Sequence, residues 1–360
     1  MTRIIFAGGG TAGHIEPALA VARKWKLQNS DCEIIFLGTK TGLENTLVPA
    51  AGFPLSYISK VVVPRRLSLQ LLTIPFSLLR AIAQSHRVIS RADLVIGFGG
   101  YVSAPAYLAA ALARRPFVIH EANARPGLAN RLGALFTPYK AVSHPVARGS
   151  LKEALLTGLP LKENIAAAFT RAQSDWSSAR QSAKRSLGFD EKLPLVFIFG
   201  GSQGSTAINQ VIAACEKSIT SADVNILHGV GARAQLPQSH QRYQAVQYIT
   251  DMATAYLAAD LIIARSGAVT CAEVNTLGRF ALFIPLPIGN GEQTLNAASL
   301  VEQGRAEVIS QETFTAEWLR HNLKRLLTLS QASTISGSTQ DIEASDKIVA
   351  LMNHALSGGR

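Results

Sequence analysis

The stretch TRIIFAGGGTAGH at residues 2–14 decides the fold. A short apolar run passes directly into three glycines, and the pattern that follows predicts a helix that reaches Gln28 and has Pro17 in its first turn. A strand, a glycine loop and a helix N-terminus together form a cradle for an anion, because the first amides of a helix lack partners within it and the helix dipole favours negative charge. The chain therefore begins with a Rossmann-like unit.

The same rhythm of apolar run, turn and amphipathic stretch recurs along the chain. Further strands are predicted at residues 33–37, 94–98 and 117–120, and then at 195–199, 224–228, 261–264 and 281–284. Strands that alternate with helices are typical of a parallel sheet with helices on both faces. The stretch TGLPLK at residues 157–162 separates the two series and has the Gly and Pro content of a hinge.

We therefore predict an α/β protein of two doubly wound domains, residues 1–160 and 161–340, that face a deep cleft. Ligands bind beyond the carboxyl ends of the strands in such sheets, so the loops after the strands are the candidate sites.

Composition narrows the class of protein and of partner. A chain of 360 residues, 48% of them hydrophobic, can bury two cores, and a formal charge of +11 favours anionic partners such as nucleotides, nucleic acid or an acidic membrane surface. The three cysteines are far apart in the sequence, and the first residues lack the pattern of a signal peptide, so we expect a cytoplasmic protein. The uncharged run at residues 94–113 contains four glycine or proline interruptions, which favour a strand, a turn and a helix over a membrane span.

The first glycine loop leaves alternatives open. Gly8, Gly10 and Gly13 satisfy the GxGxxG pattern of dinucleotide-binding proteins. That pattern also requires an acidic residue at the end of the second strand, where this chain has Gly-Thr-Lys ending at Lys40. NAD is therefore disfavoured, whereas Lys40 keeps an NADP-dependent oxidoreductase open. A third interpretation is that the glycines form a tight turn that serves packing alone.

Three motifs in the second half are candidates for binding a nucleotide sugar. The loop GGSQGS at residues 200–205 is a second anion cradle, in which Ser202 can bond a phosphate oxygen. In RSGAVTCAE at residues 265–273, Glu273 can accept both hydroxyls of a ribose or can be a partner of the helix dipole. The loop at residues 285–296 offers the amides of Gln293 and Asn296, which both donate and accept as sugar hydroxyls require.

Transfer from a nucleotide sugar requires charge stabilisation at the leaving diphosphate and a base for the acceptor hydroxyl. The chain contains no DxD pair to hold a metal, so the glycine loops and helix dipoles are expected to stabilise the leaving group without one. The candidate bases at strand ends are His14 and Glu121, and either can instead be structural.

Six runs, in order, resemble the MurG family, the UDP-N-acetylglucosamine:lipid I N-acetylglucosaminyltransferases of glycosyltransferase family 28. The runs are GGGTAGHIEPALAVA from Gly8, GFGGYVSAPAYLAA from Gly97, HEANARPGLANR from His120, GGSQGS from Gly200, RSGAVTCAEV from Arg265 and GNGEQTLNA from Gly289. The resemblance covers almost the whole chain. It implies a GT-B fold whose C-terminal helix, residues 341–360, returns to the first domain. It also implies inverting, metal-independent and cofactor-free transfer from UDP-N-acetylglucosamine (UDP-GlcNAc) to the 4-hydroxyl of the muramyl sugar of lipid I, giving lipid II.

The resemblance also implies roles for individual residues. Ser202 meets the diphosphate, the backbone of Ile249 the uracil, and residues 268–273 the sugar and ribose. The full set implied for UDP-GlcNAc is Thr11, Ala12, Gly13, Asn123, Lys162, Ser202, Ile249, Ala268, Val269, Thr270, Glu273 and Gln293. The set implied for the acceptor is Gly10, His14, Gly99, Gly100 and Tyr101.

This chain departs from the family pattern at two of those positions. Ala12 replaces a glycine of the usual GGTGGH, and a Cβ restricts the backbone there. Lys162 replaces the arginine of the usual NPVR. A lysine keeps the positive charge but lacks the planar guanidinium group with its fork of hydrogen-bond donors. Weaker donor affinity is the expected consequence.

The acceptor implies a peripheral position on the cytoplasmic face of the cell membrane and no nucleic-acid partner. Residues 61–82 are apolar and flanked by Arg65, Arg66 and Arg80, so aliphatic side chains such as Leu71, Leu72 and Phe76 can enter the interface beside anionic lipids. An ordinary buried helix pair is the alternative. For the whole protein, a GT-B transferase with a different lipid acceptor and a non-enzymatic nucleotide-sugar or membrane-surface module also stay open.

Overall fold

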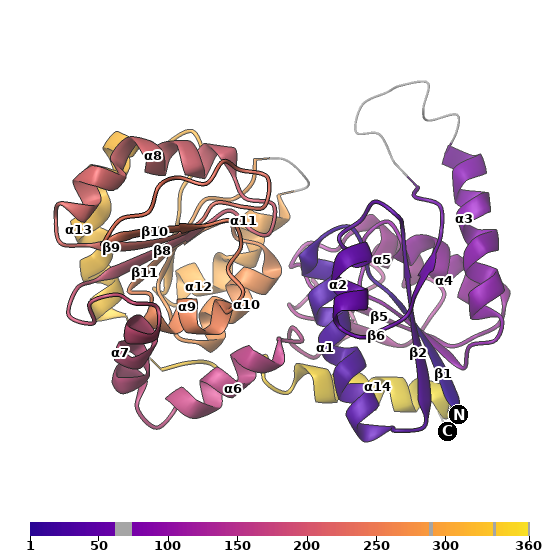
Figure 1. Ribbon diagram of the computed structural model, residues 1–360. Helices are drawn as coiled ribbons and strands as arrows, with labels where there is room; N and C mark the ends of the chain where they lie inside the picture. The colour runs from indigo at the N-terminus through magenta and orange to yellow at the C-terminus, as the bar shows by residue number, and fades with distance from the viewer. Residues whose placement is uncertain (62–73, 288–290, 334–335, 359–360) are drawn as a thin grey trace. The chain divides into compact units, whose positions relative to one another are not determined.

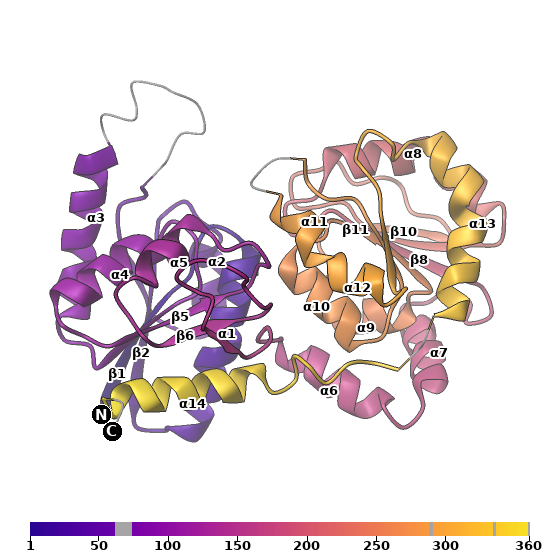
Figure 2. The same cartoon turned by 180° about the vertical axis from the view of Figure 1, so that it is seen from behind.

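The computed structural model describes residues 1–61, 74–287, 291–333 and 336–358 (Figure 1). The chain divides into two compact units, Met1–Lys162 together with Asp341–Arg360, and Glu163–Gln340. Each unit contains one parallel sheet between layers of helices, as Figure 2 shows from behind. This confirms the predicted class of two parallel α/β domains.

The sheet of the first unit has the strand order β3-β2-β1-β4-β5-β6-β7, with every neighbouring pair parallel. The order 3-2-1-4-5 is that of a dinucleotide-binding sheet. The strands are β1 (Thr2–Ala7), β2 (Cys32–Gly38), β3 (Leu55–Tyr57), β4 (Leu94–Gly97), β5 (Phe117–Glu121), β6 (Lys140–Val142) and β7 (Leu155–Leu156).

Alternate residues of each central strand face opposite layers. Ile4 and Phe6 of β1 pack with α1 (Ala12–Gln28), α2 (Glu44–Ala50) and α14 (Ala344–Leu356), whereas Ile5 and Ala7 pack with the other layer. That layer consists of α3 (Ile74–Ile89), α4 (Ser103–Leu112) and α5 (Leu128–Gly133) (Figures 1 and 2). Because both faces are covered, the strands read as continuous apolar runs rather than alternating ones.

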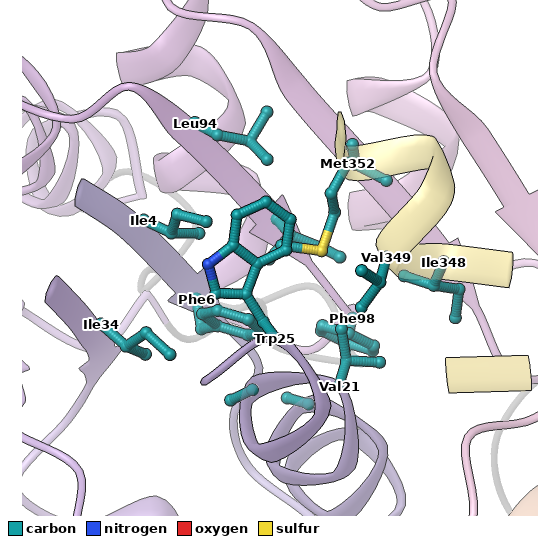
Figure 3. Close-up of a cluster of buried hydrophobic side chains, with 14 of the residues drawn as sticks. Ile4, Phe6, Val21, Trp25, Ile34, Leu94, Phe98, Ile348, Val349 and Met352 are labelled. Carbon is teal, nitrogen blue, oxygen red and sulfur yellow. The ribbon is translucent and has the colours of Figure 1, made fainter. Parts of the chain in front are cut away.

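The last helix completes the core of the first unit. Ile348, Val349 and Met352 of α14 are buried in one cluster with Trp25 of α1, and Figure 3 shows Met352 beside the indole of Trp25. The C-terminal part of the chain thus returns to the sheet of the first unit. The two described ends lie close together (Figure 1).

The second unit has the strand order β10-β9-β8-β11-β12-β13, again all parallel. The strands are β8 (Leu195–Phe199), β9 (Asn225–Gly229), β10 (Tyr243–Val246), β11 (Leu261–Ala264), β12 (Ala281–Phe283) and β13 (Ala306–Val308). One face packs on α8 (Thr206–Thr220) and α13 (Ala316–Ala332), and Phe197 and Phe199 meet Tyr256 of α9 (Met252–Ala258) on the other. The remaining helices are α6 (Glu163–Ala172), α7 (Trp176–Ser186), α10 (Ala268–Thr276), α11 (Glu292–Asn296) and α12 (Ala298–Glu302).

Two local predictions can be compared with the structure. The uncharged run at residues 94–113 forms β4, a glycine turn and α4, as predicted, and none of the helices in the described ranges is long and apolar enough to cross a membrane. The placement of Pro17 was wrong. Because α1 begins at Ala12, Pro17 lies in its second turn, where the missing amide leaves the carbonyl of Gly13 without the usual helical donor.

Candidate active site

The loops after β1, β4 and β5 meet at the carboxyl edge of the first sheet, because these strands are neighbours. The first two loops touch backbone to backbone. A Cβ at Gly100 would lie 2.1 Å from the carbonyl oxygen of Gly9, and Gly99 and Gly100 have φ angles of +89° and +82°. Only glycine combines this conformation with this approach. The structure therefore explains Gly99 and Gly100 by the closeness of the two loops.

His14 lies in the first turn of α1, with its ring against the loop of Gly99. Its Nδ1 is 3.1 Å from the carbonyl oxygen of Gly9 and 3.2 Å from Oγ1 of Thr11. Since a carbonyl only accepts, we assign the proton to Nδ1, which leaves Nε2 as the basic nitrogen. Burial lowers the pKa of His14 below its usual value, although the charges of Glu121 and Glu44 act in the opposite direction. The imidazole is therefore neutral near pH 7 and able to accept a proton.

Glu121, the other predicted base, is buried and engaged on both oxygens. Its Oε1 accepts from the backbone amide and the side chain of Asn123 at 3.0 and 3.2 Å. Its Oε2 accepts from the amide of Gly127 at 2.8 Å and from Asn130 at 3.0 Å. The carboxylate thus holds the turn after β5 together. The structure brings the two predicted bases within electrostatic range, and of the two His14 has the geometry of a base.

A carboxylate that the sequence did not reveal lies beneath the first glycine loop. Glu44, at the start of α2, is fully buried and accepts from the amide of Gly10 at 3.0 Å and from the hydroxyl of Tyr101 at 2.9 Å. The Tyr101 ring covers Gly10, where a Cβ would lie 2.8 Å from it. The amide of Gly10 is thus already paired with an anion of the protein itself.

The remaining predicted residues of the first unit have identifiable surroundings. Thr11 is the N-cap residue of α1 with extended backbone, and Ala12 and Gly13 begin the helix, where amides have no intrahelical acceptor. Among described residues, positive φ outside glycine occurs at Arg114 and Asp223, so Ala12 adopts an ordinary conformation and its Cβ causes no strain. Lys162 forms an ion pair with Glu16 of α1 at 2.9 Å.

In the second unit, the loop of residues 200–205 connects β8 to α8. Ser205 is the N-cap residue of α8, and its Oγ accepts from the amide of Ile208. A Cβ at Gly204, whose φ is +77°, would lie 2.1 Å from the carbonyl oxygen of Val230, so this loop packs closely on the end of β9. Ser202 is partly buried in the same loop. Ile249 lies beside the last residue of β9, since a Cβ at Gly229 would contact its Cγ1 at 3.2 Å.

Arg265 connects the loops that follow three strands of this unit, β8, β12 and β13, a role that sequence reasoning missed. Its Nη2 donates to Oγ of Ser205 at 2.8 Å and to Gln311 at 2.6 Å, and its Nη1 donates to the carbonyl of Ile284 at 3.0 Å. The side chain is buried, and burial lowers its pKa. The sequence offered one signal for this role, which is that Arg265 follows a strand directly and precedes Ser-Gly.

The helix α10 places the third motif. Ala268, Val269 and Thr270 form its first turn after the N-cap Gly267, which provides no side-chain cap. Glu273 is 4% exposed and its Oε2 accepts from the hydroxyl of Tyr256 at 2.8 Å. Glu273 therefore braces α9 against α10 in this structure.

The two predicted amide residues of α11 differ in surroundings. Gln293 is partly buried and its Oε1 accepts from the amide of Leu286 at 2.9 Å. Asn296 is 2% exposed and donates to the carbonyl of Ser266 at 3.3 Å, so it holds α11 to the loop before α10. Residues 288–290 of this motif lie outside the described residues. Where the structure describes the chain, no three His, Cys, Asp or Glu side chains are grouped to hold a metal ion.

Comparison with known proteins identifies relatives of both units. Residues 4–138 match the glycosyltransferase family 28 N-terminal domain, and residues 195–350 match the glycosyltransferase family 28 C-terminal domain. A protein of Thermobifida fusca is 41% identical over 99% of this chain and 90% of its own length. One of Frankia casuarinae is 42% identical over 99% of this chain and 96% of its own. Both are named UDP-N-acetylglucosamine–N-acetylmuramyl-(pentapeptide) pyrophosphoryl-undecaprenol N-acetylglucosamine transferase.

Among solved structures, MurG of Acinetobacter baumannii superposes with a TM-score of 0.74 at 30% identity, covering 98% of this chain and 99% of that one. A glycosyltransferase of kitacinnamycin shares the fold, with a TM-score of 0.63 at 15% identity over 98% of this chain and 95% of its own. These findings give no support to an NADP-dependent oxidoreductase.

Proposed function

The chain belongs to glycosyltransferase family 28, and from that premise we propose that it transfers GlcNAc from UDP-GlcNAc to the 4-hydroxyl of the muramyl sugar of lipid I. The product is lipid II, the disaccharide-linked precursor of peptidoglycan. The single observation that carries the mechanism is the state of His14. Its Nδ1 is held by the carbonyl of Gly9, its Nε2 is the basic nitrogen, and its lowered pKa keeps it neutral.

The reaction is a single displacement at C1 of the GlcNAc. The acceptor O4 forms the new C1–O4 bond while the bond from C1 to the β-phosphate oxygen breaks, and UDP leaves with the electron pair. Nε2 of His14 takes the hydroxyl proton, a contribution of about 10²–10⁴-fold in general-base catalysis. Attack from the face opposite the leaving group inverts the anomeric centre. Glu121 supports this step as a negative charge that favours the imidazolium.

Stabilisation of the leaving diphosphate falls to the second unit. The helices α8 and α10 both begin at strand ends, and amides in a first turn can donate to phosphate oxygens in a low-dielectric site. We assign Ser202 to the diphosphate, Ile249 to the uracil, Ala268, Val269, Thr270 and Glu273 to the sugar and ribose, and Gln293 to a GlcNAc hydroxyl. From the first unit, Thr11, Ala12, Gly13 and Asn123 complete the donor contacts, with Lys162 contributing once released from Glu16.

The acceptor contacts are assigned to Gly10, His14, Gly99, Gly100 and Tyr101. The amide of Gly10 is already engaged by Glu44, so we do not assign this amide to an acceptor phosphate.

A comparison of acceptors tests the function. The purified protein is incubated with UDP-GlcNAc and either a short-chain lipid I analogue or the same lipid diphosphate carrying GlcNAc in place of the muramyl peptide. We expect a disaccharide product from the first acceptor alone. Product from both acceptors would favour a GT-B transferase with a broader lipid acceptor. Binding of UDP-GlcNAc without any product would favour a binding module.

We further propose that the protein docks on the cytoplasmic face of the membrane through α3. Phe76 and Leu79 are 77% and 64% exposed, and Arg80 lies beside them on an exposed turn of the helix. Apolar side chains beside an arginine suit an interface with anionic headgroups. The predicted contributors Leu71 and Leu72, with Arg65 and Arg66, lie outside the described residues.

Sedimentation with vesicles tests the docking surface. The double variant Phe76→Ser/Leu79→Ser is compared with Leu236→Ser/Val301→Ser, a matched change at exposed positions of the second unit. We expect the α3 variant to lose binding to anionic vesicles while the control binds as the wild type does. Equal binding of all three proteins would refute docking through α3.

A further inference from the structure

We infer that Glu44 is a positioning residue for transfer: its buried carboxylate occupies the place of an anion in the first glycine loop and fixes the loop that carries His14. This inference rests on the proposed function for its kinetic part. The carboxylate belongs to α2, a helix to which neither the motifs nor the implied site residues assign a role in the reaction.

Four donors converge on this one carboxylate. Oε2 accepts from the amide of Gly10 at 3.0 Å, and Oε1 accepts from the amide and hydroxyl of Thr39 at 2.9 and 3.1 Å and from the hydroxyl of Tyr101 at 2.9 Å. The donors come from the loops after β1, β2 and β4. A single side chain therefore connects three neighbouring loops at the carboxyl edge of the sheet.

The surrounding glycines show how closely the loops fit around Glu44. A Cβ at Gly42 would lie 2.0 Å from Oε2, one at Gly38 would lie 2.5 Å from Cγ, and one at Gly9 would lie 3.3 Å from Oε1. Gly9 is also the residue whose carbonyl holds Nδ1 of His14. The position of the imidazole thus depends on a loop whose next amide, that of Gly10, is fixed by Glu44.

Stability alone does not explain a carboxylate at this site. Taking a charge out of water is costly, and replacing a buried ionic group by a packed apolar one is often neutral or stabilising. The carboxylate instead provides four directional hydrogen bonds that set the loop geometry, and a negative charge near the base. The bonds outweigh burial and lower the pKa of Glu44, so it is ionised at neutral pH.

The charge also acts on His14. Burial lowers the pKa of His14, whereas Glu121 from β5, the carbonyl of Gly9 and Glu44 from α2, in that order of size, all raise it. Tyr101, which contacts Glu44, has its pKa raised to about 12 and stays neutral, and Lys60 lies 5.0 Å from the centre of its ring. Removing the charge of Glu44 should therefore lower the pKa of His14 further.

Two substitutions compare a variant without the charge of Glu44 and a variant that keeps it. Glu44→Gln keeps the shape and the three bonds at Oε1 but places an NH₂ group against the amide of Gly10, and it removes the charge. Glu44→Asp keeps the charge but is one methylene too short to reach both Gly10 and Thr39. The matched control is Glu153→Gln at an exposed position of the same unit.

The test combines pH profiles of kcat/KM with NMR titration of the His14 ring, a readout that needs no substrate. For Glu44→Gln we expect kcat/KM to fall on the order of 10–100-fold. We also expect the acid limb of its profile and the His14 titration to move to lower pH. For Glu44→Asp we expect reduced kcat with the acid limb near that of the wild type.

Wild-type rates and an unchanged His14 titration in both variants would overturn the inference. A shifted titration in a protein whose wild type transfers no sugar would instead overturn the proposed function and leave the influence of Glu44 on His14 standing.

Discussion

His14 illustrates how one buried side chain acquires a catalytic state. Replacement by Ala removes the proton acceptor, so we expect kcat/KM for transfer to fall about 10²–10⁴-fold with little change in donor affinity. In the wild type, activity should be lost as the pH falls through the His14 pKa, which lies below 6.5 because burial disfavours the imidazolium. Initial rates between pH 4.5 and 8.5 check both statements. An acid limb that persists in His14→Ala would assign the titration to another group.

Asp341 is a buried acid whose charge works against folding. Its Oδ1 accepts from the amide of Leu159 at 2.8 Å, yet burial raises its pKa from 3.8 to about 6. The folded state therefore holds the proton more tightly than the unfolded state. The resulting penalty is absent well below pH 3.8, grows between 3.8 and about 6, and is complete above that, at up to about 3 kcal/mol.

Asp341→Asn keeps the shape and the acceptor but removes the charge. We expect this variant to exceed the wild type in free energy of unfolding at pH 7.5 and to keep only about a third of that advantage at pH 4.5. Urea unfolding at the two pH values measures it, with the exposed Glu153→Gln as the control. An advantage that does not change with pH would mean that Asp341 does not titrate in this range.

At the scale of residues, the sequence predicted some members of the candidate active site and missed others. Glu121 ends β5 and His14 lies in the first turn of the helix after β1, so their place at the sheet edge could be inferred. Glu44 could not, because it reaches the loop from a helix that follows the next strand, and only the fold brings the two together. Arg265 stood in a quoted motif, but its bonds to Ser205 and Ile284 depend on strand order, which the sequence does not specify.

At the scale of elements, the start of α1 is a place where this chain departs from its family pattern. Ala12 is the first residue of the helix and has ordinary backbone angles. Ala12→Gly should therefore reduce the free energy of unfolding by about 0.5–1 kcal/mol, since glycine costs more backbone entropy in a helix. Thermal unfolding measures the change. A more stable Ala12→Gly variant would mean that the alanine is strained after all.

The strands predicted from the sequence include the three-residue β12, whereas three short strands at the sheet edges were not predicted. The runs that became β1, β2, β8 and β11 are buried on both faces, which produces an unbroken apolar signal. In contrast, β3, β7 and β13 have two or three residues, and all three lie at or next to a sheet edge. Such strands are too short for a periodic pattern, and pairing with a neighbour rather than propensity determines them.

At the scale of the whole molecule, the main consequence of the chain path is that the last helix completes the hydrophobic core of the first unit. Met352 is fully buried in the cluster of Trp25. Met352→Ala should cost about 2–5 kcal/mol of stability, the usual range for truncating a buried methionine. The neighbouring exposed residue provides the control, since Asn353→Ala should be neutral or slightly stabilising in a helix. Urea unfolding followed by tryptophan fluorescence compares the two, and equal midpoints would contradict a role for α14 in this core.

The measurement that bears on the proposed reaction as a whole is the initial rate of GlcNAc transfer from labelled UDP-GlcNAc to a short-chain lipid I analogue in EDTA, with the product linkage determined by NMR. We expect transfer that EDTA does not reduce, and a β-linked product, because α-linked GlcNAc in the donor is inverted. A rate abolished by EDTA and restored by a divalent cation would contradict stabilisation of the leaving group by helix termini. Failure to form the disaccharide with any divalent cation present would contradict the proposed function itself.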